Sequence, residues 1–135
     1  MEKYAVNYEE IKALPLEERE DFANNSAKIL FGKPSGCMFW ATFLPGGFHA
    51  THIHTNCDEY VYILSGSGLK GVGDKVYELR ENCAYYLPRG VPHWMLNTHP
   101  TKPIQVIGFY PGFPDFDGTG YKYIGPIPEN IKKGE

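Results

Sequence analysis

The chain has 135 residues, of which 42% are hydrophobic and 21% are charged, and these ordinary values exclude a disordered or low-complexity protein. The 13 basic and 16 acidic residues give a net charge of −3, and no basic run occurs, so nucleic acid is not expected as a partner. No apolar stretch approaches the roughly 20 residues of a membrane helix, and no apolar signal region opens the sequence. We therefore expect a cytoplasmic protein with no membrane partner.

Residues 1–36 form a predicted N-terminal extension. Within residues 8–31, helix-favouring stretches rich in glutamate, such as residues 16–22, are interrupted by Pro15 and by Asn24 and Asn25. Proline and asparagine disfavour the interior of a helix, so the pattern predicts one or two short helices and not a long one.

From Gly36 onward, short runs of apolar, aromatic and β-branched residues alternate with turn residues, as the 15 glycines and 11 prolines allow. Eight such runs are predicted strands: residues 37–44, 48–54, 59–64, 68–72, 75–79, 83–87, 93–97 and 104–110. An all-β fold with eight short strands and regular turns favours a double-sheet jelly roll over residues 37–110.

Residues 111–135 are too rich in proline and glycine for a second domain, but their aromatic residues predict an ordered C-terminal arm that packs on the barrel. The chain is therefore expected to form a single domain overall. Its three cysteines, Cys37, Cys57 and Cys83, are far apart and form no CxxC pair. They are interpreted as small buried hydrophobic residues, not as disulfides or zinc ligands.

The residues that carry chemistry are three histidines and one glutamate. His52 and His54 are two positions apart, so their side chains lie on one face only if the segment is a strand. Glu59 follows the turn at residues 55–58 and opens the next predicted strand, while His93 follows the stiff turn at residues 88–92. The four side chains can then converge. Three nitrogen donors and one oxygen donor suit one divalent transition metal (Fe, Mn, Ni, Co or Zn) better than Ca²⁺ or Mg²⁺.

The same residues fit a family pattern. The spacing of the first cupin motif is matched by Gly46, His52, His54, Glu59 and Gly66, and that of the second by Pro88, Gly90, His93 and Asn97. Over residues 37–110 the sequence thus resembles the cupin superfamily, in particular its small single-domain barrels. This resemblance implies a jelly-roll (double-stranded β-helix) barrel in which His52, His54, Glu59 and His93 are the metal ligands. Asn82 replaces a glycine of the second motif, but asparagine tolerates the left-handed conformation, so the turn is expected to survive.

Such a centre would carry a net charge of about +1 and leave two adjacent positions open, which favours a small chelating substrate rich in oxygen. A hydroxy-carbonyl compound, a keto acid or a sugar would fit. Cupins include many activities, and the fold does not choose among them. We favour a metal-dependent, non-redox isomerase, lyase or decarboxylase. A non-haem iron dioxygenase and a small-molecule binding or sensor protein remain the alternatives.

Candidate acid–base residues follow from strand parity. One of Tyr85 and Tyr86 must face the interior, where a phenol could donate to a developing oxyanion. His49 has the wrong parity relative to His52 unless a bulge intervenes. Tyr60 and Tyr62 are expected to point away from the ligands, and these outward aromatic residues predict a homodimer.

Overall fold

Strands make up most of the computed structural model, which describes residues 3–14 and 19–129. The strands are β1 (Phe22–Lys33), β2 (Gly36–His54), β3 (Glu59–Ser65), β4 (Gly68–Val72), β5 (Lys75–Leu79), β6 (Ala84–Leu87), β7 (His93–Asn97), β8 (Ile104–Pro111) and β9 (Tyr121–Gly125). Two short 3₁₀ helices, η1 (Tyr8–Glu10) and η2 (Asp117–Thr119), accompany them. The predicted all-β jelly-roll fold is confirmed. Among the described residues, no helix has the length and hydropathy that a membrane crossing requires.

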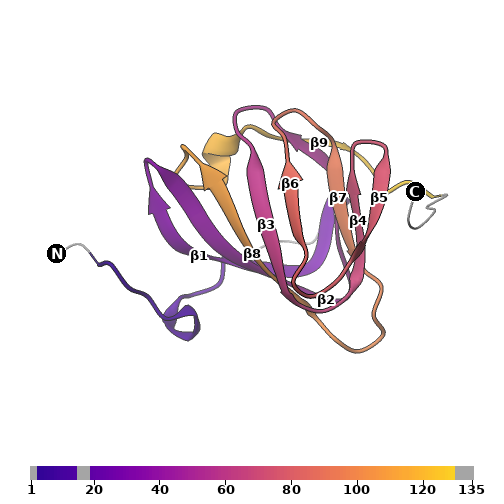
Figure 1. Cartoon of the computed structure of the whole chain (residues 1–135), viewed down its shortest axis with the longest axis horizontal. Helices are drawn as coiled ribbons and strands as arrows, with labels where there is room; N and C mark the ends of the chain where they lie inside the picture. The colour runs from indigo at the N-terminus through magenta and orange to yellow at the C-terminus, as the bar shows by residue number, and fades with distance from the viewer. Residues whose placement is uncertain (1–2, 15–18, 130–135) are drawn as a thin grey trace.

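The strands form one curled antiparallel sheet in the order β5-β4-β7-β2-β8-β3-β6, with β1 and β9 also paired to β2 (Figure 1). β2 is the longest strand and pairs with four others. Its first part pairs with β1 and β8, and its second part pairs with β7, β9 and the start of β1. Because β2 passes from one group of neighbours to the other, the sheet wraps around a common interior.

Two strands expected from the sequence are in fact the two parts of β2. The prolines and glycines at residues 45–47 were expected to end a strand, but the pairing with β1 continues past them. Gly46 adopts a positive φ of 76°, and the register against β1 shifts between Ala23 and Asn25. The three residues therefore form a bulge that bends the strand instead of a turn that reverses it.

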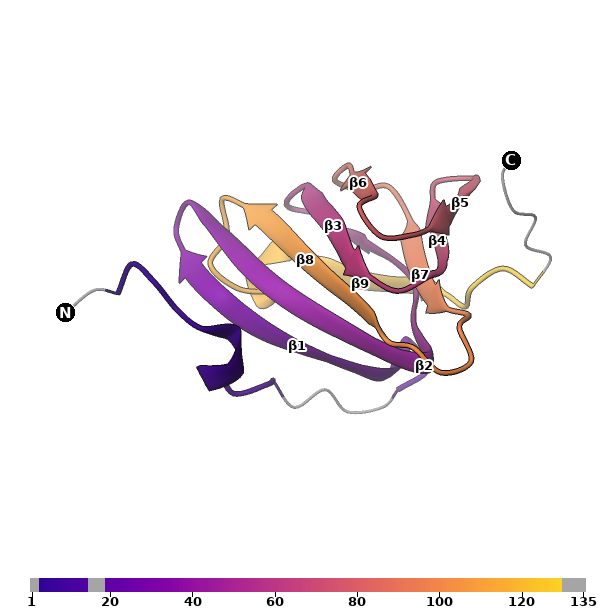
Figure 2. The ribbon, with the colours of Figure 1, turned by 60° about the horizontal axis from the view of Figure 1, so that its bottom comes forward.

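The N-terminal region contains less helix than expected. Among the described residues of this region, helix is limited to η1, and β1 covers residues 22–31 of the segment 8–31 in which short helices were predicted. Residues 15–18, within the glutamate-rich stretch, lie outside the described residues. β1 runs beside the whole first part of β2 (Figure 2), and the amide of Asn25 donates to the carbonyl of Phe48. Over residues 22–31, pairing with the following strand thus overrides a weak local preference for helix.

The interior holds two clusters of apolar side chains. One contains Phe43, Val61, Ile63, Leu79, Met95, Ile104 and Val106, and the other contains Cys37, Phe39, Cys57 and Tyr110. Cys37 and Cys57 are buried and free, as expected, whereas Cys83 is partly exposed. Asn82 has a φ of 67°, so it takes the left-handed conformation that its place in the second motif requires.

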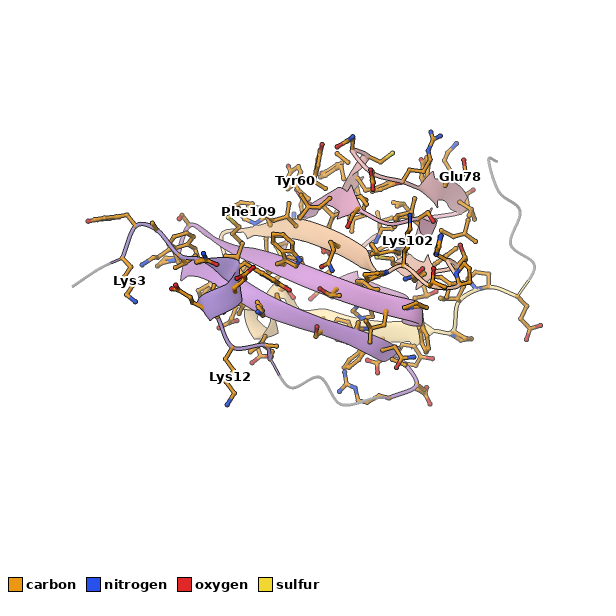
Figure 3. The ribbon with its side chains drawn as sticks, turned by 90° about the horizontal axis from the view of Figure 1, so that it is seen from below. Lys3, Lys12, Tyr60, Glu78, Lys102 and Phe109 are labelled. Atoms are coloured by element: carbon orange, nitrogen blue, oxygen red, sulfur yellow. The ribbon has the colours of Figure 1, made fainter. Side chains whose placement is uncertain are left out.

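The outer face of the sheet carries aromatic side chains. Tyr60 and Tyr62 are exposed, as strand parity predicts. Cross-strand register aligns Met38, Phe109, Tyr60 and Tyr86 in one row over β2, β8, β3 and β6. Tyr60 and Phe109 of this row project from the same side of the sheet in Figure 3. We call these four residues, three aromatic residues and one methionine, the aromatic row.

Candidate metal centre

Three strands bring the four predicted ligands together inside the barrel. His52 and His54 lie near the end of β2, and His93 opens β7 directly opposite His52 in the sheet register. Glu59 is the first residue of β3. All four are buried, with exposed fractions of 7% or less. One ring nitrogen from each histidine lies within 4.8 Å of the others, as the spacing of the motif predicts.

Hydrogen bonds orient each imidazole. The Nδ1 atoms of His52 and His93 lie 2.7 and 3.1 Å from the carbonyl oxygens of Ala50 and Val91, which can only accept, so both nitrogens carry protons. The Nδ1 of His54 lies 2.8 Å from the hydroxyl of Thr119. That hydroxyl donates to the carbonyl of Phe116 and therefore accepts from His54.

These bonds leave the Nε2 atoms as lone-pair donors. In a neutral imidazole only one nitrogen carries a proton, and burial is the main cause that lowers the pKa of both His52 and His93. Protonated Nδ1 atoms that donate to acceptors are the usual arrangement when Nε2 binds a metal.

Two of these Nε2 atoms, in His54 and His93, are buried and have no hydrogen-bond partner among the described residues. Each lies 3.4 Å from Oε1 of Glu59. Lone pairs that face a carboxylate repel each other unless a cation lies between them. The residues therefore fit a divalent metal ion.

His49 also reaches this centre, because a bulge changes its parity. The register of β2 against β7 shifts between His49 and His52, and the two rings stack with centroids 3.7 Å apart. Burial lowers the pKa of His49 to about 3, so its ring is neutral. Its Nε2 lies 3.1 Å from the hydroxyl of Tyr121, which itself donates to Oδ2 of Asp21 at 2.7 Å. The Nε2 of His49 is thus the donor to Tyr121, and Nδ1 retains the lone pair.

Asp21 ends this chain of hydrogen bonds. Arg19 also donates to its Oδ2, at 3.0 Å. Burial raises the pKa of the Asp21 carboxyl, but the hydrogen bond from Tyr121 and the charge of Arg19 outweigh burial, so the pKa lies below its usual value of 3.8. Burial and the bond to Asp21 raise the pKa of Tyr121. The phenol therefore stays protonated and keeps both partners in place.

The structure does not bring Tyr85 or Tyr86 to the centre. Tyr85 packs against the apolar core, as one of the pair was expected to do, but its hydroxyl donates to the carbonyl of Glu78. Tyr86 lies on the outer face, where its hydroxyl donates to Asp58. Tyr85 lies opposite Val61 on the inner face, but neither tyrosine is among the residues that line the cavity beside the ligands.

Sequence reasoning missed several residues that do reach the centre. Tyr110, at the inner face of β8, is buried close to Glu59, and burial raises its pKa well above the usual value. Lys70 is buried on β4. Thr119 and Tyr121 come from the C-terminal arm, which was expected only to pack on the barrel. A lysine in an otherwise apolar strand was the one local signal among them.

The ligands open into a cavity of about 430 Å³, a size typical of small-molecule sites. Its lining combines apolar side chains, including Phe43, Val61 and Met95, with the four predicted ligands, Lys70 and Tyr110. The arrangement can hold a metal beside a largely apolar space.

Comparison with known proteins agrees with this geometry. The family model described as "Cupin domain" matches residues 39–110. The chain is 31% identical over 75 residues to oxalate oxidase 1 of Hordeum vulgare, a match that covers 50% of this chain and 37% of that protein. The chain thus spans little more than a third of the length of this curated relative.

Solved structures share the fold. A cupin-2 domain protein from Rhodospirillum rubrum superimposes with a TM-score of 0.75 at 17% identity, covering 91% of this chain and 81% of that one. A predicted oxalate decarboxylase from Thermotoga maritima gives a TM-score of 0.73 at 18% identity, covering 81% and 99%. At these identities the likeness establishes the fold alone.

Proposed function

The chain belongs to the cupin family, and from this premise we propose that it is a metal-dependent enzyme acting on a small, oxygenated, chelating substrate. A hydroxy-carbonyl compound, a keto acid or a sugar fits this description. The reaction that we favour is a non-redox isomerisation, lyase reaction or decarboxylation. The observation that carries the proposal is the buried convergence of His52, His54 and His93 beside Glu59 at the wall of a cavity.

His52, His54, Glu59 and His93 would hold one divalent transition metal (Fe, Mn, Ni, Co or Zn). When bound, the metal would act as a Lewis acid that polarises a substrate oxygen and stabilises negative charge developing there.

Other residues of the chain would orient the imidazoles and exclude water from the cavity. The carbonyls of Ala50 and Val91 and the hydroxyl of Thr119 keep three imidazoles in one orientation, which lowers the reorganisation needed on binding. The apolar part of the cavity excludes water from the substrate and strengthens polar interactions within it.

His49 is the candidate acid–base residue that the geometry supports. It lies at the cavity wall, and Tyr121 and Asp21 fix its ring through Nε2. Its Nδ1 is left as the nitrogen able to exchange a proton with a substrate. Tyr85 and Tyr86 have no part in this proposal.

A redox reaction is the second candidate, because the curated relative from Hordeum vulgare is named an oxalate oxidase. The same four ligands would serve a non-haem iron dioxygenase. A protein that binds an oxyacid without turnover is the third, and it would show saturable binding but no product.

The test is to load the protein separately with Fe²⁺, Mn²⁺ and Zn²⁺ and to screen hydroxy acids, keto acids, sugars and oxalate with and without O₂. A His52→Ala variant serves as the control without metal. Turnover that survives removal of O₂ with manganese or zinc is the expected result. Activity supported by iron alone and lost without O₂ would overturn the non-redox proposal.

A further inference from the structure

Lys70 is a buried cation with no hydrogen-bond or ion-pair partner among the residues that the structure describes. It lies in the middle of β4, is 3% exposed, and lines the cavity. No described group makes a hydrogen bond or an ion pair with its ammonium, although lysine offers three donors. Lysine is rarely buried in this way unless it is paired, because removing the charge from water costs several kcal/mol.

The sheet register explains why this side chain points inward. On the strand pair β4–β7, Lys70 lies opposite Met95, and Val72 lies opposite His93. Opposite residues share a face, and positions two apart on one strand share it as well. Lys70 is therefore on the same face as His93 and is its diagonal neighbour, at a typical separation of about 7–8 Å.

The charges around Lys70 belong to the metal centre. Burial lowers the pKa of Lys70 to about 8, and the negative charge of Glu59 on β3 partly offsets this. The positive charge of Lys70 also contributes to the lowered pKa values of His49 on β2 and His93 on β7. A bound divalent metal would neutralise Glu59 and leave the ammonium without a compensating charge. The combined charge of metal, Glu59 and Lys70 would then be about +2.

We propose that Lys70 binds a carboxylate of the substrate while another part of the same molecule reaches the metal, so that the enzyme prefers small dicarboxylates. This inference rests on the proposed function, because it assigns a substrate class to that site. A dicarboxylate carries two negative charges and so matches the combined charge of the loaded site. The apolar surroundings of Lys70 strengthen such an ion pair, because little water competes for the ammonium.

The test compares ligands matched in carbon number on zinc-loaded protein by isothermal titration calorimetry: malonate against propionate, and succinate against butyrate. The variant is Lys70→Met, which keeps the length of the side chain and removes its charge. The matched control is Lys75→Met, at an exposed lysine of the neighbouring strand β5. Zinc content is measured for every protein.

Wild-type protein and Lys75→Met are expected to bind a dicarboxylate more tightly than its monocarboxylate partner. In Lys70→Met the dicarboxylate affinity falls about tenfold or more, while the monocarboxylate affinity and zinc content stay near wild type. Compared with zinc-loaded wild-type protein, the zinc-loaded variant also unfolds at a higher urea concentration, because it lacks a buried charge that Glu59 no longer compensates.

Unchanged preference for dicarboxylates in zinc-loaded Lys70→Met would overturn the inference and leave the proposed function standing. If Lys70→Met is less stable than wild type but still prefers dicarboxylates, Lys70 has a structural role only, and the inference is likewise overturned. If the wild-type protein retains no zinc, the comparison is made with whichever of Fe²⁺, Mn²⁺, Ni²⁺ and Co²⁺ it retains. Retention of none of the five metals would refute the proposed metal enzyme, so the metal measurement separates the two failures.

Discussion

Replacing Thr119 by valine should weaken metal binding although Thr119 touches no metal. Its hydroxyl accepts from Nδ1 of His54 at 2.8 Å and donates to the carbonyl of Phe116 at 2.6 Å. Valine keeps the shape of the side chain but can do neither. His54 is then free to rotate or to move its proton to Nε2, where it blocks the lone pair that faces Glu59.

The expected size of the effect follows from the burial of these groups. Loss of a hydrogen-bond partner behind a metal-binding histidine typically reduces metal affinity by about 10–100-fold, which corresponds to about 1.4–2.7 kcal/mol. Thr119 is fully buried, so water cannot replace the lost acceptor. The unpaired groups should also lower the free energy of unfolding by about 1–3 kcal/mol.

The assay is competition for Zn²⁺ against a chromophoric chelator, with Thr119→Ser as the matched control. Serine keeps the hydroxyl and loses only a buried methyl group, so it should lose about 1 kcal/mol of stability but retain metal affinity. If Thr119→Val binds zinc within about twofold of wild type, the argument that this hydroxyl orients His54 is wrong.

Three further predictions concern other parts of the molecule. His52→Ala should abolish metal binding, whereas His49→Ala should leave metal content largely intact; loss of metal in the second variant would make His49 a ligand. We also propose that the aromatic row mediates a homodimer, so light scattering should give about twice 15.3 kDa, and Tyr60→Lys with Phe109→Lys should shift this mass toward the monomer. A monomeric wild-type protein would contradict the proposed homodimer. Because the carboxyl pKa of Asp21 is lower in the folded state than its usual 3.8, its stabilisation is present above that pH and lost as pH falls through the folded pKa. Asp21→Asn should thus lower the urea midpoint at pH 7, and the midpoints of variant and wild type should lie closer together near pH 3. An equal difference in midpoint at both pH values would refute this role of Asp21.

Much of the candidate metal centre was predictable because its signals are local. His52 and His54 are two apart, and a strand must place them on one face. Glu59 and His93 each follow a predicted turn, and both strands begin where the turn residues predict. The inward face of β3 and the outward position of Tyr60 follow from the same period of two.

The other functional residues depend on pairings between distant segments. Thr119 reaches His54 only because β9 pairs with the end of β2, and no local pattern in a segment rich in glycine predicts that contact. Lys70 faces the centre through the register of β4 on β7. His49 enters through a bulge, which moves a side chain to the other face and has no reliable signature in one sequence.

Metal analysis of the reconstituted protein tests the central claim most directly. Untagged protein is incubated separately with Fe²⁺, Mn²⁺, Ni²⁺, Co²⁺ and Zn²⁺, desalted, and measured by inductively coupled plasma mass spectrometry. The buried nitrogen atoms of His52, His54 and His93 beside Glu59 predict about one metal ion per chain with at least one of these metals. Near-zero content with all five would contradict the assignment of this cluster as a metal centre.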